Sequence, residues 1–169
     1  GILLTLTLGC SLALAAALPP GRPLADIPME SLGNTTVTAR EYLGKTVLIA
    51  VITTRCPECI ATAEMMTRLQ RELGPRGVQM IGAIAGSNQK NLVPPFIARY
   101  KINFPLGFVY PEAIQKLANL SPGIRPFVPI LIFVDREGMV RQQYFGNDPF
   151  LAKGQVETTV RNTLEQLVT

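Results

Sequence analysis

The sequence predicts an α/β protein in which helices flank a central mixed β-sheet. Three observations support this fold class: a β-branched apolar run at residues 46–53 (TVLIAVIT), a helical apolar pattern that begins near Pro57, and a second apolar run at residues 78–85 (VQMIGAIA). A strand, a helix and a strand in this order form a βαβ unit, for which parallel pairing and a right-handed crossover are the strong default.

Length and composition favour one globular domain. A chain of 169 residues, 47% of them hydrophobic and 17% charged, is long enough to bury a substantial core. The net charge of +4 is scattered without a basic run, so we expect no nucleic-acid partner. Histidine is absent from the sequence, which excludes histidine-ligated metals, Ser/His/Asp triads and Cys/His dyads.

The first part of the chain predicts export. Residues 1–18 are apolar and uncharged, and residues 15–17 (AAA) match a signal-peptide cleavage site. An uncleaved membrane anchor and a lipid attachment at Cys10 are the alternatives, although Thr7 stands where lipoprotein sites favour leucine. We therefore expect a signal peptide or membrane anchor at 1–18, a Pro/Gly-rich linker at 19–28 and the folded domain at 29–169. Each of these routes places that domain outside the cytoplasm, where a dithiol can be oxidised.

The folded domain is expected to open with a β-hairpin. Gly33 and Asn34 favour a turn between two short strands within residues 29–45. The strand at residues 46–53 follows, and because it is apolar throughout we expect it to be covered on both faces.

The next helix carries the motif CPEC, with Cys56 and Cys59. Pro57 suits the first turn of a helix, where its missing N–H costs nothing. A series of residues spaced by three or four predicts the buried face of the helix: Cys59, Ala63, Met66, Leu69 and Leu73. Cys56 is therefore expected at the N-terminal end of the helix and Cys59 on its buried side.

The rest of the chain follows the second strand of the βαβ unit. The expected elements are helices at 92–100 and 111–120 with an extended segment at 103–109 between them, a Pro/Gly loop at 121–129, a hairpin of 130–135 and 139–145, and a C-terminal helix marked by Val156, Val160, Leu164 and Leu167.

The position of Cys56 predicts thiol chemistry. A helix N-terminus presents unpaired N–H groups and the positive end of the helix dipole, and both favour a thiolate. Arg55 adds positive charge, whereas Glu58 opposes it if it turns toward the sulfur. After Cys56 attacks a substrate disulfide, Cys59 lies one helical turn away and can resolve the mixed disulfide. We expect these two residues to be catalytic and to form a reversible disulfide.

Two other uses of the cysteine pair are less well supported. A metal site needs three or four protein ligands, and only Cys56 and Cys59 remain as soft ligands once Cys10 is assigned to the leader. A purely structural disulfide that closes so short a loop restricts the unfolded chain little. We therefore expect no metal and no cofactor other than the redox-active disulfide.

Beyond the motif itself, the sequence resembles the thioredoxin fold, and more closely the extracytoplasmic TlpA/ResA-like thiol-disulfide oxidoreductases of the redoxin group, related to AhpC/TSA. The resemblance covers about residues 27–168 and includes GKTVLIAV, INFPL and PILIFVDREGMV. It implies a three-layer thioredoxin-like fold with an N-terminal β-hairpin and a central insertion.

The resemblance also implies roles for individual residues. Cys56 is the attacking thiol, Cys59 the resolving thiol, and Pro129 a cis-proline opposite the pair. The backbone at Val128 holds an extended substrate segment. The implied function is exchange of electrons with protein disulfides in the reducing direction, in the periplasm or tethered to the membrane facing it, with a membrane protein as electron donor.

Departures from the family concern proton transfer and the peroxidase alternative. Arg55 replaces the usual tryptophan, and Thr62 stands where many members have an acid, so water and Glu58 are the candidate proton acceptors for Cys59. A peroxiredoxin-like peroxidase that uses Cys56 is the alternative enzyme: Thr53 matches its motif, but Ile49 occupies the proline position. A non-enzymatic binding module of the same fold is the other alternative.

Overall fold

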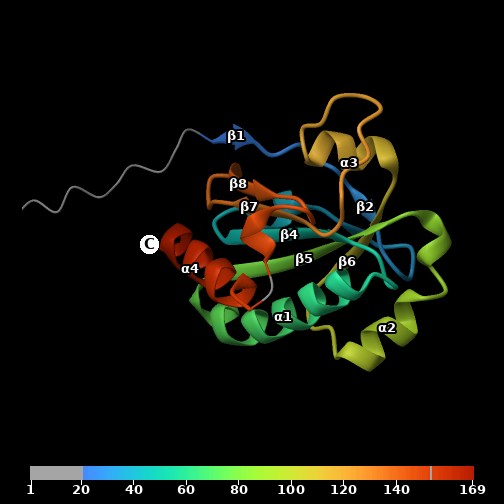
Figure 1. The fold of residues 1–169 in the computed structure, drawn as a ribbon, viewed down its shortest axis with the longest axis horizontal. Coiled ribbons are helices and arrows are strands. Elements are labelled where there is room, and N and C mark those ends of the chain that lie inside the picture. Colours follow the sequence, from blue (N-terminus) through green and yellow to red (C-terminus); the bar gives the residue numbers. More distant parts are fainter. Residues whose placement is uncertain (1–20, 153) are drawn as a thin grey trace, which may run out of the picture.

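The computed structural model describes residues 21–152 and 154–169 (Figure 1). The predicted signal peptide or anchor at 1–18, with Cys10, lies outside the described residues. Within the described part of the chain, no helix has the length and apolar character needed to cross a membrane.

The described strands form one mixed sheet of eight strands in the order β1-β8-β7-β4-β5-β6-β2-β3 (Figure 1). The strands are Arg22–Pro23 (β1), Met29–Glu30 (β2), Thr36–Val37 (β3), Thr46–Ile52 (β4), Val78–Ala85 (β5), Leu106–Val109 (β6), Ile130–Val134 (β7) and Met139–Tyr144 (β8). β4 and β5 run parallel, as do β5 and β6, while β7 is antiparallel to β4. The predicted βαβ unit and the predicted hairpin of β7 and β8 are confirmed.

Helices cover both faces of the sheet and give three layers. The α-helices are Pro57–Leu73 (α1), Val93–Tyr100 (α2), Pro111–Leu117 (α3) and Val156–Val168 (α4). α1 and α4 lie against one face and α3 against the other (Figure 1). The predicted helices are confirmed, with α3 ending three residues earlier than expected because Asn119 adopts a positive φ of 51°.

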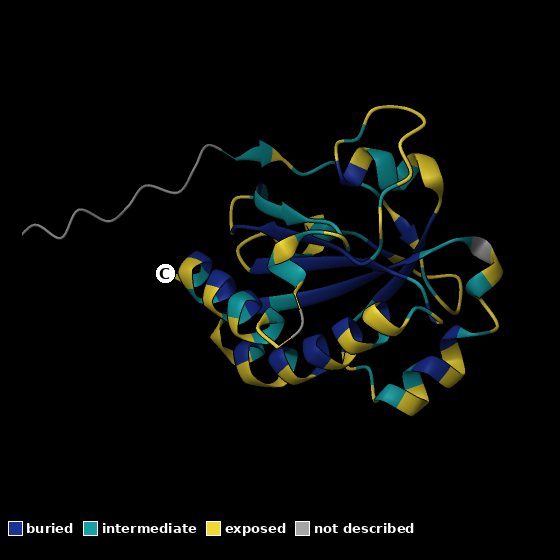
Figure 2. Ribbon diagram, viewed as in Figure 1, coloured by how far each residue is buried: buried dark blue, intermediate teal, exposed yellow. Residues whose placement is uncertain are grey.

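The strand that leads to the cysteine motif is the centre of the core. All seven residues of β4 are buried, and Figure 2 shows the central strands in dark blue. Leu48, Ala50 and Ile52 face the cluster under α1, whereas the residues between them face the opposite cluster. β4 is thus covered on both faces, as its apolar sequence predicts, and it holds the start of α1 in a fixed position.

The N-terminal hairpin forms where the sequence predicts it. β2 and β3 are antiparallel, and the turn between them contains Gly33 (φ 79°) and Asn34 (φ 59°), both in the left-handed region. β2 then pairs with β6, at Glu30 opposite Phe108. The central insertion therefore contributes β6 to the sheet, and the N-terminal hairpin pairs with this strand.

The segment predicted as a linker (19–28) is part of the folded domain in its described residues, 21–28. Arg22 and Pro23 form β1, which pairs with β8. The Arg22 guanidinium donates to the Leu117 carbonyl and to Gln143 Oε1, both at 2.7 Å. Leu24 and Ile27 pack against the core. This segment joins the sheet because its two apolar side chains and the arginine find partners there.

Candidate active site

The two cysteines differ in their exposure. Cys56 is the N-cap of α1, with an extended backbone (φ −77°, ψ 123°), and its carbonyl accepts the first helical hydrogen bond from the Ile60 N–H at 2.9 Å. Cys56 is half-buried, whereas Cys59 is 0% exposed, and both are free thiols in this structure. The predicted positions at the helix end and on its buried face are therefore observed, and Cys56 alone can meet a substrate.

Burial dominates the acidity of Cys59. It raises the pKa of the Cys59 thiol to about 12 from an ordinary value of 9.0. Hydrogen bonding from the Thr53 backbone N–H and hydroxyl lowers this pKa, while the neighbouring Cys56 adds to the rise. Cys59 is therefore a protonated, waiting thiol at neutral pH.

The raised pKa predicts a loss of stability of the reduced protein in alkali. The unfolded chain loses the Cys59 proton near pH 9, whereas the folded chain keeps it up to about pH 12. Because the folded state then binds more protons, the free energy of unfolding falls with rising pH in this window, by at most about 1.4 kcal/mol per unit.

Urea denaturation of the reduced wild type and of reduced Cys59→Ala, between about pH 8 and pH 11, isolates this effect, since all other groups titrate in both proteins. The stability advantage of the wild type is expected to shrink as the pH rises. An advantage that stays constant over the whole range would contradict the assignment.

Glu58 lies beside the Cys56 sulfur and is therefore not placed to accept the proton of Cys59. The Cys56 thiol donates to Glu58 Oε2 at 3.5 Å, and no hydrogen bond between Glu58 and Cys59 is found within the described residues. Thr62, which stands in the family's acidic position, donates its hydroxyl to the Glu58 carbonyl at 2.8 Å. Water is thus the remaining candidate proton acceptor for Cys59, and Glu58 instead accepts the hydrogen bond from Cys56.

Glu58→Gln is expected to accelerate alkylation of Cys56 at neutral pH. The carboxylate repels a thiolate at this distance, and because Glu58 is exposed the gain is about two- to fivefold. Iodoacetamide labelling followed by mass measures the rate. Glu64→Gln, at another exposed position of α1, is the matched control and should leave the rate unchanged. Equal rates for Glu58→Gln and the control would show that the carboxylate has no influence on Cys56.

The loop before β7 supplies the opposite wall. The Val128–Pro129 peptide is cis, as the resemblance implies for Pro129. Gly146 lies directly against it: the Gly146 N–H donates to the Phe127 carbonyl at 3.0 Å, and a Cβ on Gly146 would collide with the Val128 carbonyl. Glycine at position 146 is therefore required by close packing, which no pattern in the sequence indicates.

A groove begins between the motif and this wall. It has a volume of about 520 Å³ and runs along α1 toward the first turn of α4. Its lining comprises Pro57, Glu58, Ala61, Thr62, Met65, Arg68, Pro129, Gly146, Leu151, Gly154, Val156 and Glu157. An ion pair of 2.7 Å between Arg68 and Glu157 lies at the end near α4. The groove therefore extends from the residues beside Cys56 to the first turn of α4.

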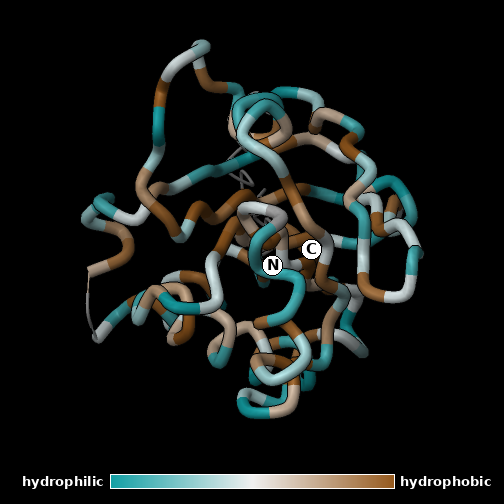
Figure 3. The backbone as a smooth tube through the Cα atoms, turned by 90° about the vertical axis from the view of Figure 1, so that its right-hand side faces the viewer, coloured by the Kyte–Doolittle hydropathy of each residue, from teal (hydrophilic) through white to brown (hydrophobic). Residues whose placement is uncertain are grey.

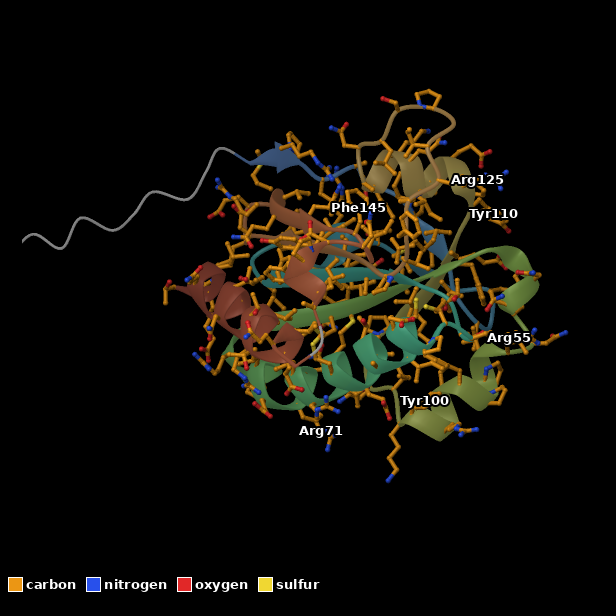
Figure 4. The ribbon with its side chains drawn as sticks, viewed as in Figure 1. Arg55, Arg71, Tyr100, Tyr110, Arg125 and Phe145 are labelled. Carbon is orange, nitrogen blue, oxygen red and sulfur yellow. The ribbon has the colours of Figure 1, made fainter. Side chains whose placement is uncertain are left out.

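Exposed apolar and basic side chains surround this end of the molecule. Phe127 is 65% exposed, next to Val128, and Ile124 is exposed in the same loop. Arg55, Tyr110 and Arg125 lie at this end, with Arg55 extending away from the molecule (Figure 4). Figure 3, which views the same end, shows hydrophilic segments of the chain around its edge. Exposed apolar and basic side chains therefore lie near the loop that contains Val128.

Sequence reasoning missed the residues that hold the turn before Cys56. Thr54 is buried and donates its hydroxyl to Gln89 Oε1 at 2.5 Å. Gln89 lies in the 3₁₀ turn Ser87–Gln89 after β5, a stretch without regular periodicity. No sequence signal relates these two positions, because their contact depends on how the loops pack. The described residues contain no cluster of three or more histidine, cysteine or acidic side chains suited to a metal ion.

Comparisons with known proteins agree with this geometry. The model of the AhpC/TSA family matches residues 20–143. The thiol-disulfide oxidoreductase ResA of Halalkalibacterium halodurans is 28% identical over 128 residues, which cover 75% of this chain and 68% of that protein.

Solved structures show the same fold. A thiol:disulfide interchange protein of the thioredoxin family from Chlorobium tepidum has a TM-score of 0.73 at 17% identity, covering 90% of this chain and 100% of the other. A secreted Mycobacterium tuberculosis disulfide oxidoreductase homologous to E. coli DsbE has a TM-score of 0.62 at 20% identity, covering 82% and 95%. The predicted three-layer thioredoxin-like fold is confirmed.

Proposed function

The chain belongs to the AhpC/TSA family, and we propose that it is a thiol-disulfide oxidoreductase that reduces protein disulfides outside the cytoplasm through Cys56 and Cys59. One observation carries the proposal: a half-buried thiol at a helix N-terminus stands one turn before a fully buried thiol on the same helix. The ResA relative is named a thiol-disulfide oxidoreductase.

The reaction uses the difference in exposure. The Cys56 thiolate attacks one sulfur of a substrate disulfide, the other substrate sulfur leaves as a thiolate, and a mixed disulfide forms. Cys59 then gives up its proton to water and attacks the Cys56 sulfur, which releases the second substrate sulfur. Two electrons pass to the substrate, and the protein is left with a Cys56–Cys59 disulfide.

The wall at Val128 and Pro129 is the proposed substrate contact. Phe127 and Ile124 offer exposed apolar area in the same loop, and Pro129 lines the groove. An extended polypeptide beside the attacked disulfide can place its backbone along Val128 and its apolar side chains in the groove. Protein disulfides are therefore the proposed substrates.

Sustained reduction requires an electron source. The Cys56–Cys59 disulfide must be reduced again by a dithiol, and in an exported protein we propose that a membrane protein supplies it. The apolar segment at 1–18 supports export, either as a cleaved signal or as a tether, and the M. tuberculosis relative is described as secreted. Enzymatic activity of an alkaline phosphatase fused after residue 28, in a bacterial host, tests export.

Turnover assays separate the candidate functions. The protein is given dithiothreitol as electron source and either insulin, whose disulfides it should reduce, or hydrogen peroxide. The proposal predicts faster reduction of insulin than by dithiothreitol alone. Rapid consumption of peroxide without insulin reduction would instead identify a thiol peroxidase, and inactivity toward both would identify a binding module.

A further inference from the structure

The turn between β4 and α1 is held by one side chain from another loop. Gln89 Oε1 accepts two hydrogen bonds from Thr54, one from its hydroxyl at 2.5 Å and one from its backbone N–H at 3.3 Å. Thr54 is 8% exposed and stands two residues before Cys56. A buried hydroxyl and N–H that lost this acceptor would be left without a partner, so the contact strongly favours this backbone conformation.

Gln89 is itself fixed from the far side. Its carbonyl accepts from the Leu92 N–H at 2.8 Å, which closes the turn before α2. The next residue, Lys90, forms an ion pair of 2.6 Å with Glu30 of β2 and lies 5.6 Å from the centre of the Phe108 ring in β6. The loop that carries Gln89 is thus tied to the sheet edge, and Gln89 braces the motif against it.

The braced turn carries the polar groups that serve Cys59. Thr53, the residue before Thr54, is the one whose backbone and side-chain hydrogen bonding lowers the pKa of the buried Cys59 thiol against the effect of burial. Because Glu58 lies beside Cys56, Thr53 is the residue of the described part of the chain that offers hydrogen bonding to a thiolate forming on Cys59. Its placement depends on the Thr53–Thr54 backbone.

We propose that Gln89 is a positioning residue for the resolving step: by holding Thr54, it keeps the Thr53 donors against the Cys59 sulfur. The inference rests on the proposed disulfide exchange and adds a residue that acts on its second half. In that half the Cys59 thiolate forms a bond to the Cys56 sulfur, the mixed disulfide breaks, and the leaving sulfur departs as a thiolate with the electron pair. Gln89 touches neither sulfur and acts through the turn.

The two halves of the reaction can be timed separately with the aromatic disulfide dithiobis(nitrobenzoate). Attack by Cys56 releases one coloured nitrothiobenzoate and leaves the other on Cys56, and attack by Cys59 on the Cys56 sulfur releases the second. Stopped-flow absorbance of the reduced protein in a Cys10→Ser background therefore shows two phases. The variants are Gln89→Ala, Thr54→Val and their combination. Asn91→Ala is the control, an exposed neighbour outside the side-chain hydrogen bonds of Gln89, whereas Asn88 Oδ1 accepts from Gln89 Nε2.

In Gln89→Ala the second phase is expected to slow by about tenfold while the first changes less than about twofold. Thr54→Val, which loses one of the two bonds, slows the second phase by about threefold, and the double variant is no slower than Gln89→Ala. Asn91→Ala matches the wild type. A second phase unchanged in Gln89→Ala, or both phases slowed equally, would overturn the assignment.

Failure of the fold and failure of the proposed function give different results. Thermal unfolding of each variant identifies one that does not fold, and Thr54→Val then supplies the decisive reading, because valine preserves the shape of threonine. If the wild type itself releases only one nitrothiobenzoate, the proposed exchange function fails and the inference fails with it. If the wild type shows both phases and all variants match it, only the role of Gln89 is lost.

Discussion

Cys56→Ser is expected to abolish insulin reduction, with a loss on the order of 10³-fold or more, because a hydroxyl is a far weaker nucleophile than a thiolate. Cys56 is the half-buried member of the pair and caps α1, so the substitution removes the attacking atom from the only one of the two sulfurs that a substrate can reach. Insulin reduction with dithiothreitol, in a Cys10→Ser background, measures the effect.

The control for this variant is a measurement of its thermal stability, which shows whether it still folds. Serine is a good N-cap residue, so thermal unfolding of Cys56→Ser should resemble that of the reduced wild type. Retained activity in a folded Cys56→Ser protein would remove Cys56 from the mechanism and with it the exchange function.

Cys59→Ser is expected to retain attack and lose resolution. Cys59 is fully buried behind Cys56, so its replacement leaves the attacking thiol exposed while removing the group that releases the substrate. Turnover should fall by roughly a hundredfold, and a covalent mixed disulfide between Cys56 and the substrate should accumulate. Non-reducing mass spectrometry after incubation with insulin detects the adduct, which dithiothreitol then removes.

Cys56→Ser provides the comparison for this trap, since it retains Cys59 and should form no adduct. Adducts in Cys56→Ser that equal those in Cys59→Ser would mean that Cys59 also reaches substrate, against its burial. Mixed disulfides trapped on Cys59→Ser in cell extracts would also identify the proteins whose disulfides Cys56 attacks.

The fold was predictable from sequence where one residue pattern dominates. The apolar run of β4 and the spacing of Cys59, Met66 and Leu69 on α1 are local signals of burial, and the structure confirms both. Gly33 and Asn34 likewise mark a turn because their backbone angles favour it. β1 escaped prediction because Arg22 and Pro23 acquire strand geometry only by pairing with β8, a contact across most of the chain.

In the candidate site, the positions of the two cysteines on α1 were predictable from sequence, and the contacts around them were not. The CPEC motif identifies Cys56 and Cys59 as candidates, and the family resemblance identifies Pro129. The Thr54–Gln89 bonds and the close approach of Gly146 to Val128 join segments far apart in sequence, and neither leaves a composition or a period to read. The side to which Glu58 turns is a choice of side-chain conformation, which the sequence also leaves open.

The most direct test of the central claim, that Cys56 and Cys59 form a redox-active pair, is a titration of the protein against glutathione redox buffers in a Cys10→Ser background. Alkylation and intact mass follow the fraction with an internal disulfide. We predict one two-electron transition at about −270 mV, the potential of thioredoxin, as suits a reductant. A transition at about −120 mV would reverse the proposed direction. The absence of an internal disulfide at every potential would contradict the claim itself.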